Sequence, residues 1–215
     1  MTLDERYQLR KWLADGGPAE VILIGASTGG PDALTALLRG MPKDCPPIVV
    51  VQHIAPAMVA GFAQRLARTA GLQLGESKTG TLLRRGYIYL SLDSSHIGVR
   101  KGLSGPIIVM DDGPAEGGHR PSVDHMFHDA AKYLHDVRVF AALLTGMGRD
   151  GADGLKLLHD HGAYTVAQDE ASCAVFGMPK EAVRLGAVRA VGNISYIRHW
   201  MEYAAGLTKR LLKVA

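Results

Sequence analysis

Cysteine and long apolar runs are scarce in this sequence of 215 residues. The two cysteines, Cys45 and Cys173, lie far apart and form neither a Cys-x-x-Cys motif nor a disulfide framework. Such usage is typical of a reducing compartment, so we expect a cytoplasmic protein. No run of about 18 apolar residues occurs, and we therefore expect no membrane insertion.

Concentrated charge is missing as well. The 24 basic and 21 acidic residues give a formal net charge of +3, and the basic residues are spread along the chain. Proteins that bind nucleic acid usually carry a basic patch, so we expect no nucleic-acid partner. The first six residues, MTLDER, are too charged for a signal peptide.

The length and the hydrophobic content of 47% fit one globular α/β domain. Residues 3–14 are expected to form a short helix, which Gly16, Gly17 and Pro18 break. We therefore divide the chain into an N-terminal lead-in helix and linker at 1–18 and one catalytic body at 19–215.

Short apolar runs alternate with amphipathic stretches along the body, as expected of buried strands and covering helices. Strands are expected at 21–24, 48–51, 87–90, 97–100, 107–110, 139–144, 163–167 and 188–191. Helices are expected at 31–39, 57–70, 121–135, before His161, after Pro179 and at 194–213. The predicted fold is α/β: a doubly wound, mostly parallel sheet with helices on both faces and a small antiparallel hairpin.

The first strand leads into Gly25-Ala26-Ser27-Thr28-Gly29-Gly30, which invites comparison with a dinucleotide-binding loop. That fingerprint needs glycine at its third place, where the backbone approaches a pyrophosphate, but Ser27 stands there. It also needs a carboxylate at the end of the second strand, which instead ends in Gln52 and His53. Both departures argue against a nucleotide.

The same loop suits a nucleophile. Ser27 stands in a strand-to-helix turn of small residues that admit a substrate carbonyl, and the next helix N-terminus offers free N–H groups to an oxyanion. Each residue also has a structural explanation when it is taken alone. Ser27 could simply form the turn, His53 could make a structural hydrogen bond, and Asp150 suits the N-cap of the helix beginning near Gly151. Because all three follow strands, however, the carboxyl edge of a parallel sheet would assemble a hydroxyl, an imidazole and a carboxylate.

A metal hydrolase is an alternative reading of the histidines. His125, His128 and His135 fall on one face of a predicted helix, with His119 and Asp124 nearby. Histidines three residues apart can bind zinc, but no glutamate stands at the spacing of a general base. The nine histidines are scattered, and we expect no metal site.

Five longer motifs together resemble the catalytic domain of the chemotaxis protein-glutamate methylesterase (CheB) family. They are GASTGG, QHIAP, HRPSVD, LTGMGRDGADG and AQDEASCAVFGMPKEAV, and they come in the family's order. The resemblance extends over about residues 19–205. It implies hydrolysis of methyl esters on glutamates of chemoreceptor cytoplasmic helices, with release of methanol, and in many members deamidation of receptor glutamines.

The resemblance also implies roles for individual residues. Ser27 matches the family's nucleophile, His53 its base and Asp150 its orienting carboxylate, while Thr28 matches an active-site threonine. Met147 is implied as a backbone N–H donor to the substrate oxygen. The family needs no metal or organic cofactor. Gly29 and Arg120, in the same motifs, are further candidates for oxyanion or substrate contacts.

Three departures from the family pattern bear on regulation and substrate. Residues 1–18 are too short for the receiver domain that usually precedes the catalytic domain. Two alternatives follow: an excised catalytic domain, or a stand-alone member regulated differently, by a separate receiver domain or another regulator. The stretch 90–96 lacks the usual Ala-Pro and glycine, and residues 117–118 are both glycine where an asparagine is frequent. These changes leave an alternative open, a stand-alone relative that acts on another methylated partner or as a signalling scaffold.

Overall fold

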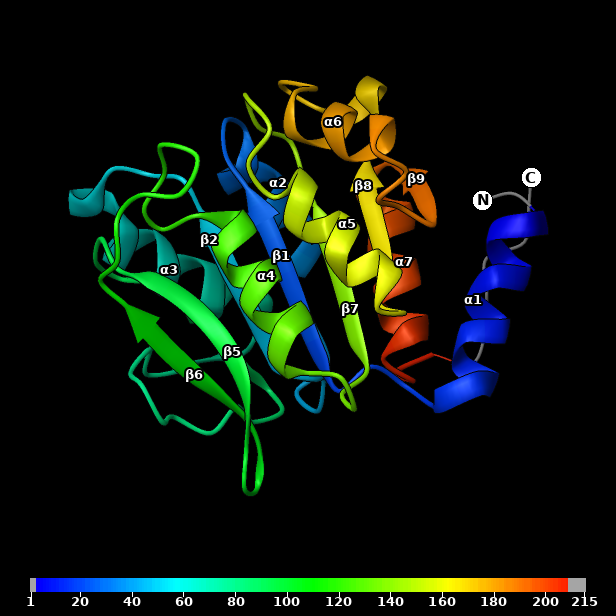
Figure 1. The fold of residues 1–215 in the computed structure, drawn as a ribbon, viewed down its shortest axis with the longest axis horizontal. Helices are drawn as coiled ribbons and strands as arrows, with labels where there is room; N and C mark the ends of the chain where they lie inside the picture. The colour runs from blue at the N-terminus through cyan, green and yellow to red at the C-terminus, as the bar shows by residue number, and fades with distance from the viewer. Residues whose placement is uncertain (1–2, 209–215) are drawn as a thin grey trace.

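The structure is a computed structural model that describes residues 3–208 of the chain (Figure 1). Its main sheet has seven strands in these residues, all parallel, in the order β3-β4-β2-β1-β7-β8-β9. The strands are β1 (Val21–Ala26), β2 (Ile48–Gln52), β3 (Gln73–Leu74), β4 (Tyr87–Leu90), β7 (Val139–Leu143), β8 (Tyr164–Gln168) and β9 (Ala190–Gly192). The predicted doubly wound parallel sheet is confirmed.

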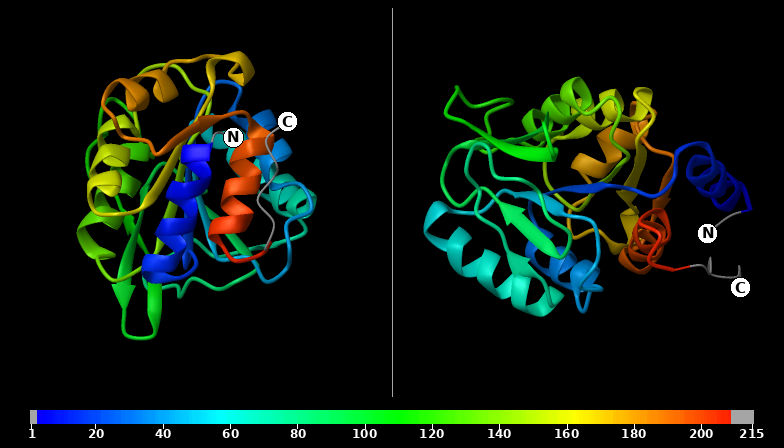
Figure 2. Two further views of the ribbon diagram at one scale, coloured as in Figure 1. Left: turned by 90° about the vertical axis from the view of Figure 1, so that its right-hand side faces the viewer. Right: turned by 90° about the horizontal axis from the view of Figure 1, so that it is seen from below.

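Helices cover both faces of the sheet (Figures 1 and 2). On one face lie α4 (Val123–Tyr133), α5 (Ala152–Asp160) and α6 (Met178–Arg184). On the other lie α2 (Gly30–Leu38), α3 (Pro56–Ala70) and α7 (Ile194–Ala204), and α1 (Leu3–Gly16) packs beside α7. A short 3-10 helix, η1, spans Glu170–Ser172.

The alternation of side chains along the strands divides the apolar core into two layers. In β1, Val21 and Leu23 face the layer beneath α4 and α5, whereas Ile22 and Ile24 face the layer beneath α2, α3 and α7. Every residue of β1 is buried. The continuous apolar run that predicted this strand is therefore explained by burial on both sides.

The predicted antiparallel hairpin is also confirmed. Strands β5 (His96–Gly102) and β6 (Gly105–Asp111) pair with each other and lie against α4 at one side of the molecule (Figure 1). Ile97 and Val99 of β5 and Ile108 of β6 are fully buried and join the core layer of α4. The hairpin thus extends this layer past the edge of the sheet.

One strand was not predicted, and one helix was expected to extend further than it does. The short edge strand β3 was not predicted, because two residues carry no periodicity. The last helix was predicted to reach residue 213, but α7 ends at Ala204, and residues 209–213 lie outside the described part of the chain. None of the described helices is long and apolar enough to cross a membrane.

The sheet changes its direction of winding between β1 and β7. From β1 the chain proceeds to β2 on one side, and later returns to place β7 on the other side of β1. In open α/β sheets, ligands bind at the carboxyl ends of the strands beside such a switch point. The loops after β1, β2 and β7 meet there.

Candidate active site

Ser27 follows β1 directly, in a turn whose backbone is held from both sides. Its N–H donates a hydrogen bond of 3.0 Å to the Thr145 carbonyl, and its carbonyl accepts one of 2.8 Å from the Gly30 N–H. The side-chain amide of Gln52 donates to the carbonyls of Ser27, at 2.8 Å, and His53, at 2.9 Å. The nucleophile candidate is therefore tied to the strands on either side of it.

Two glycines of the motifs have a steric reason. Gly29 forms the N-cap of α2 at φ 79°, a left-handed conformation that side chains with a Cβ disfavour. A Cβ on Gly146 would lie 2.8 Å from the Cβ of Ser27 and 2.2 Å from the sulfur of Met178. The loop after β7 can approach Ser27 closely only because residue 146 has no side chain.

His53 and Asp150 come together from the loops after β2 and β7. The Nε2 of His53 lies 2.8 Å from Oδ2 of Asp150, and the two side chains are 13% and 3% exposed. This contact has the distance of an ion pair without the geometry of a hydrogen bond. Nδ1 of His53 is buried and has no hydrogen-bond partner in residues 3–208, so it is the ring nitrogen left to accept a proton.

The carboxylate of Asp150 is held at the N-terminus of α4. One oxygen accepts hydrogen bonds from the Ser122 hydroxyl, at 2.8 Å, and the Asp124 N–H, at 3.0 Å. The other accepts from the Val123 N–H at 2.8 Å. Burial raises the pKa of Asp150, but the His53 side chain and these donors outweigh burial and lower it to about 2. The carboxylate therefore stays charged beside His53.

Asp150 was expected to suit the N-cap of the helix that follows it, and this was wrong. The helix that follows Asp150 is α5, whose N-cap is Gly151 and which has no side-chain capping bond. Asp150 instead binds the first N–H groups of α4, a helix that precedes it in sequence. Sequence distance hid this pairing, and so Ser122 and Val123 were not recognised as parts of the site. Gln52 was also not recognised, although it stands beside His53 in the sequence.

The secondary candidates are placed differently from one another. Thr28 and Met147 are exposed, the latter 70%, and neither N–H donates a backbone hydrogen bond among the described residues. The same is true of the Gly29 N–H in this part of the chain. Thr28 and Gly29 follow Ser27 in sequence, and Met147 follows Gly146, which lies against Ser27. All three N–H groups are therefore candidates for donors to an oxyanion.

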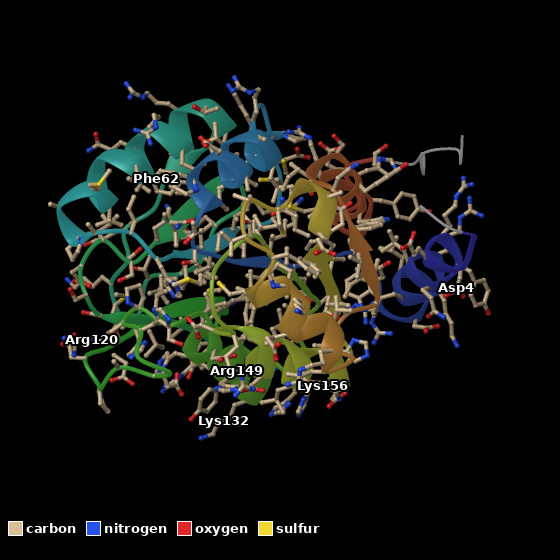
Figure 3. The ribbon with its side chains drawn as sticks, turned by 90° about the horizontal axis from the view of Figure 1, so that it is seen from above. Asp4, Phe62, Arg120, Lys132, Arg149 and Lys156 are labelled. Carbon is tan, nitrogen blue, oxygen red and sulfur yellow. The ribbon has the colours of Figure 1, made fainter. Side chains whose placement is uncertain are left out.

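Arg120 is not brought to Ser27 by any contact in residues 3–208. Its guanidinium donates to the carbonyls of Asp112 and Gly113, both at 3.1 Å, and so closes its own loop. In Figure 3, a view from the top of Figure 1, Arg120 lies at the edge of the molecule. Its role in substrate binding stays a prediction.

The histidines considered for a metal do not converge. His125 and His128 approach Glu116 at 3.2 and 3.8 Å, whereas His135 lies beyond the end of α4 and pairs with His161. The expected single helical face for His125, His128 and His135 was therefore wrong. Within residues 3–208, no three His, Cys, Asp or Glu side chains are arranged to hold a metal ion.

A cavity of about 370 Å³ opens beside Asp150. Its wall includes His119, Asp124, His128 and Arg149. Burial raises the pKa of Asp124 to about 6, and the nearby charge of Asp150 adds to this effect.

A larger cavity of about 410 Å³ is lined by residues such as Glu20 and Val139 at the amino ends of the strands, away from the three loops.

Comparison with known proteins shows the family of the chain. Residues 22–201 match the family described as CheB methylesterase. The chain belongs to this family. The crystal structure of the Thermotoga maritima CheB methylesterase catalytic domain superposes with a TM-score of 0.80 at 31% identity, covering 88% of this chain and 99% of that one.

Curated relatives carry the name protein-glutamate methylesterase/protein-glutamine glutaminase. One, from Oleidesulfovibrio alaskensis, is 48% identical over 172 residues, which are 80% of this chain and 48% of the relative. Another, from Salmonella typhimurium, is 38% identical over 194 residues, 89% of this chain and 55% of the relative. The chain thus spans about half the length of the curated relatives it matches.

Proposed function

We propose that this chain is a serine hydrolase that removes methyl esters from glutamate side chains of chemoreceptors. The observation that carries the proposal is the contact of 2.8 Å between His53 and Asp150, at the carboxyl edge of the sheet where Ser27 follows β1. A buried carboxylate that stays charged orients an imidazole and stabilises its protonated form. The names of the relatives supply the substrate class, a protein glutamate methyl ester or a glutamine.

The proposed reaction begins with attack of Ser27 Oγ on the ester carbonyl. As the new C–O bond forms, Nδ1 of His53 takes the hydroxyl proton, while Nε2 remains beside Asp150. The negative charge that develops on the carbonyl oxygen is stabilised by backbone N–H groups, for which Met147 and Gly29 are the candidates.

Three further proton transfers complete the cycle. The tetrahedral intermediate breaks its bond to the methoxy oxygen, and His53 returns its proton to that oxygen, so methanol leaves and Ser27 carries the acyl group. A water molecule then attacks the acyl carbon, giving its proton to His53. Protonation of Ser27 Oγ releases the glutamate and restores the enzyme. A glutamine substrate would release ammonia by the same steps.

Substrate, compartment and regulation belong to the same proposal. The substrate is the cytoplasmic part of methylated receptors, and a receiver domain or another protein regulates access to it. Two free cysteines, Cys45 and Cys173, are in line with a reducing cytoplasm. The alternative is a relative that acts on another methylated partner or as a scaffold.

Receptor-containing membranes with labelled methyl esters test the proposal directly. We expect the protein to release volatile labelled methanol, and Ser27→Ala to reduce the rate by several orders of magnitude. Ser104→Ala, at the exposed turn of the β5–β6 hairpin, serves as the matched control and should keep the full rate.

A serine-directed phosphonate separates the alternatives if no methanol appears. Labelling that Ser27→Ala abolishes, without methanol release, would point to a different ester. Neither labelling nor release would leave the scaffold as the better account. Full turnover by Ser27→Ala would contradict the proposed mechanism.

A further inference from the structure

A second histidine lies flat against the catalytic imidazole. The rings of His53 and His119 are stacked with their centroids 4.0 Å apart and their planes within 5° of parallel. A stack uses the face of the His53 ring and leaves both of its nitrogens in the ring plane. Asp150 can therefore hold Nε2, and Nδ1 can take the serine proton, while His119 covers the ring from one side.

A tight turn places His119 there. The N–H of His119 donates to the Glu116 carbonyl at 2.9 Å, and the Glu116 N–H donates back to the His119 carbonyl at 3.0 Å. Between them, Gly117 and Gly118 have φ values of 57° and 85°, as a two-residue hairpin turn of type I′ requires. The paired glycines, which depart from the family pattern, thus form the turn that presents His119.

The loop that carries this turn is anchored at several points. His96 contacts the Pro114 carbonyl at 3.0 Å through Nε2 and accepts the Ser122 N–H at 3.2 Å through Nδ1. The hydroxyl of Ser95 donates to Asp112 at 2.6 Å. These contacts join the loop to β5 and to the N-cap of α4, which also binds Asp150. The stacking ring and the orienting carboxylate therefore share one support.

The surroundings of His119 keep its ring uncharged near neutral pH. Burial lowers the pKa of His119, and nearby His53 lowers it further, while Asp150 opposes both. An uncharged ring presents a π face to the imidazolium that His53 becomes during the reaction. The other titratable or charged groups around the same cavity are Glu116, Asp124, His128, Arg149 and Asp153.

From this geometry we infer that His119 is a positioning residue of the esterase, whose ring holds His53 in the orientation that pairs Nε2 with Asp150. The inference rests on the proposed function for its role in a reaction, but the orientation itself is a property of the free protein. The HRPSVD motif would then support both members of the pair: Ser122 binds the carboxylate of Asp150, and His119 stacks on the imidazole of His53.

Two substitutions separate stacking from other roles. His119→Phe keeps a flat ring without a titratable group, whereas His119→Ala removes the ring. We expect His119→Ala to lower kcat for methyl-ester hydrolysis about tenfold with little change in KM. The acid limb of its pH–rate profile should move to lower pH, because protonated His53 loses the π face. His119→Phe should recover most of the rate.

Nitrogen-detected NMR of histidine-labelled protein tests the orientation without any substrate. We expect one tautomer of His53 in the wild type and in His119→Phe, with the proton on Nε2, and averaged ring signals in His119→Ala. His135→Ala, from the histidine pair at the opposite end of the molecule, is the matched control and should change neither readout.

The outcomes distinguish this inference from the proposed function. A wild type that releases no methanol but shows the expected tautomers would contradict the function and support the stack. An active wild type, with a folded His119→Ala that matches it in rate, pH profile and tautomer, would overturn the role of His119 alone. Failure of His119→Phe to restore either the rate or the tautomer would also overturn it.

Discussion

The hydroxyl of Ser122 donates a hydrogen bond of 2.8 Å to Asp150, and both side chains are buried. The same hydroxyl accepts the His125 N–H at 3.2 Å as the N-cap of α4. One serine therefore satisfies a helix terminus and the Asp150 carboxylate together. Replacing Ser122 tests whether the stability of α4 is coupled to the support of the charged Asp150 carboxylate.

Ser122→Ala is expected to reduce both stability and activity. Loss of an N-cap hydroxyl costs about 1 kcal/mol, and a hydrogen bond to a carboxylate adds a further contribution of similar size. Activity should fall less than in Asp150→Asn, since Val123 and Asp124 still donate to the carboxylate. Urea unfolding and methanol release measure the two effects, and unchanged values in both would show that the hydroxyl is dispensable.

Asp124 makes stability depend on pH in a defined direction. Because its pKa is raised to about 6 in the folded protein, folding takes up a proton between that value and the ordinary pKa near 4. The penalty for its buried charge is fully present above pH 6 and disappears as the pH falls through this window. The Asn side chain can keep the bond of 2.7 Å from the Gly154 N–H.

Asp124→Asn should therefore be more stable than the wild type at pH 8. We expect a difference on the order of 1–2 kcal/mol, allowing for partial exposure, and none below pH 4. Urea unfolding of both proteins across this range is the measurement. A difference that stayed constant with pH would show that Asp124 is not the titrating group.

The sheet and the three site residues could be predicted because their signals are local. The apolar runs of β1, β2 and β7 mark buried strands, and parallel strands bring their carboxyl ends to one edge. Ser27 and His53 directly follow β1 and β2, and Asp150 stands in the loop after β7. Their meeting follows from connectivity without any knowledge of side-chain packing.

The supporting residues could not be predicted in the same way. Ser122 and Asp150 are 28 residues apart, and only the packing of α4 against the loop after β7 joins them. The stack of His119 on His53 depends on a turn whose paired glycines looked like a departure from the family. Arg120, next to His119, has a local role in its loop that no pattern indicated.

Gln52→Leu is expected to disturb the geometry between Ser27 and His53. The wild-type amide bridges the carbonyls of Ser27 and His53, while its own oxygen has no hydrogen-bond partner in residues 3–208. Leucine keeps the volume but loses both bonds, so we expect kcat to fall about tenfold or more with a smaller change in KM. Gln64→Leu, exposed on α3, is the control. Equal kinetics for both variants would contradict the bridging role.

Two glycine-to-alanine changes should have different effects, one on activity and the other on stability. In Gly146→Ala the new Cβ would meet Ser27 and Met178 well inside contact distance, so the loop after β7 must move away from Ser27. We expect methanol release to fall by about two orders of magnitude.

Gly61, within α3, has open space around its Cβ position, and alanine there should stabilise the protein by roughly 0.5–1 kcal/mol without affecting the rate. Thermal unfolding and methanol release on both variants test the pair. An active Gly146→Ala would mean that the loop does not need its close approach to Ser27, whereas an inactive Gly61→Ala would show that the loss in either variant has another cause.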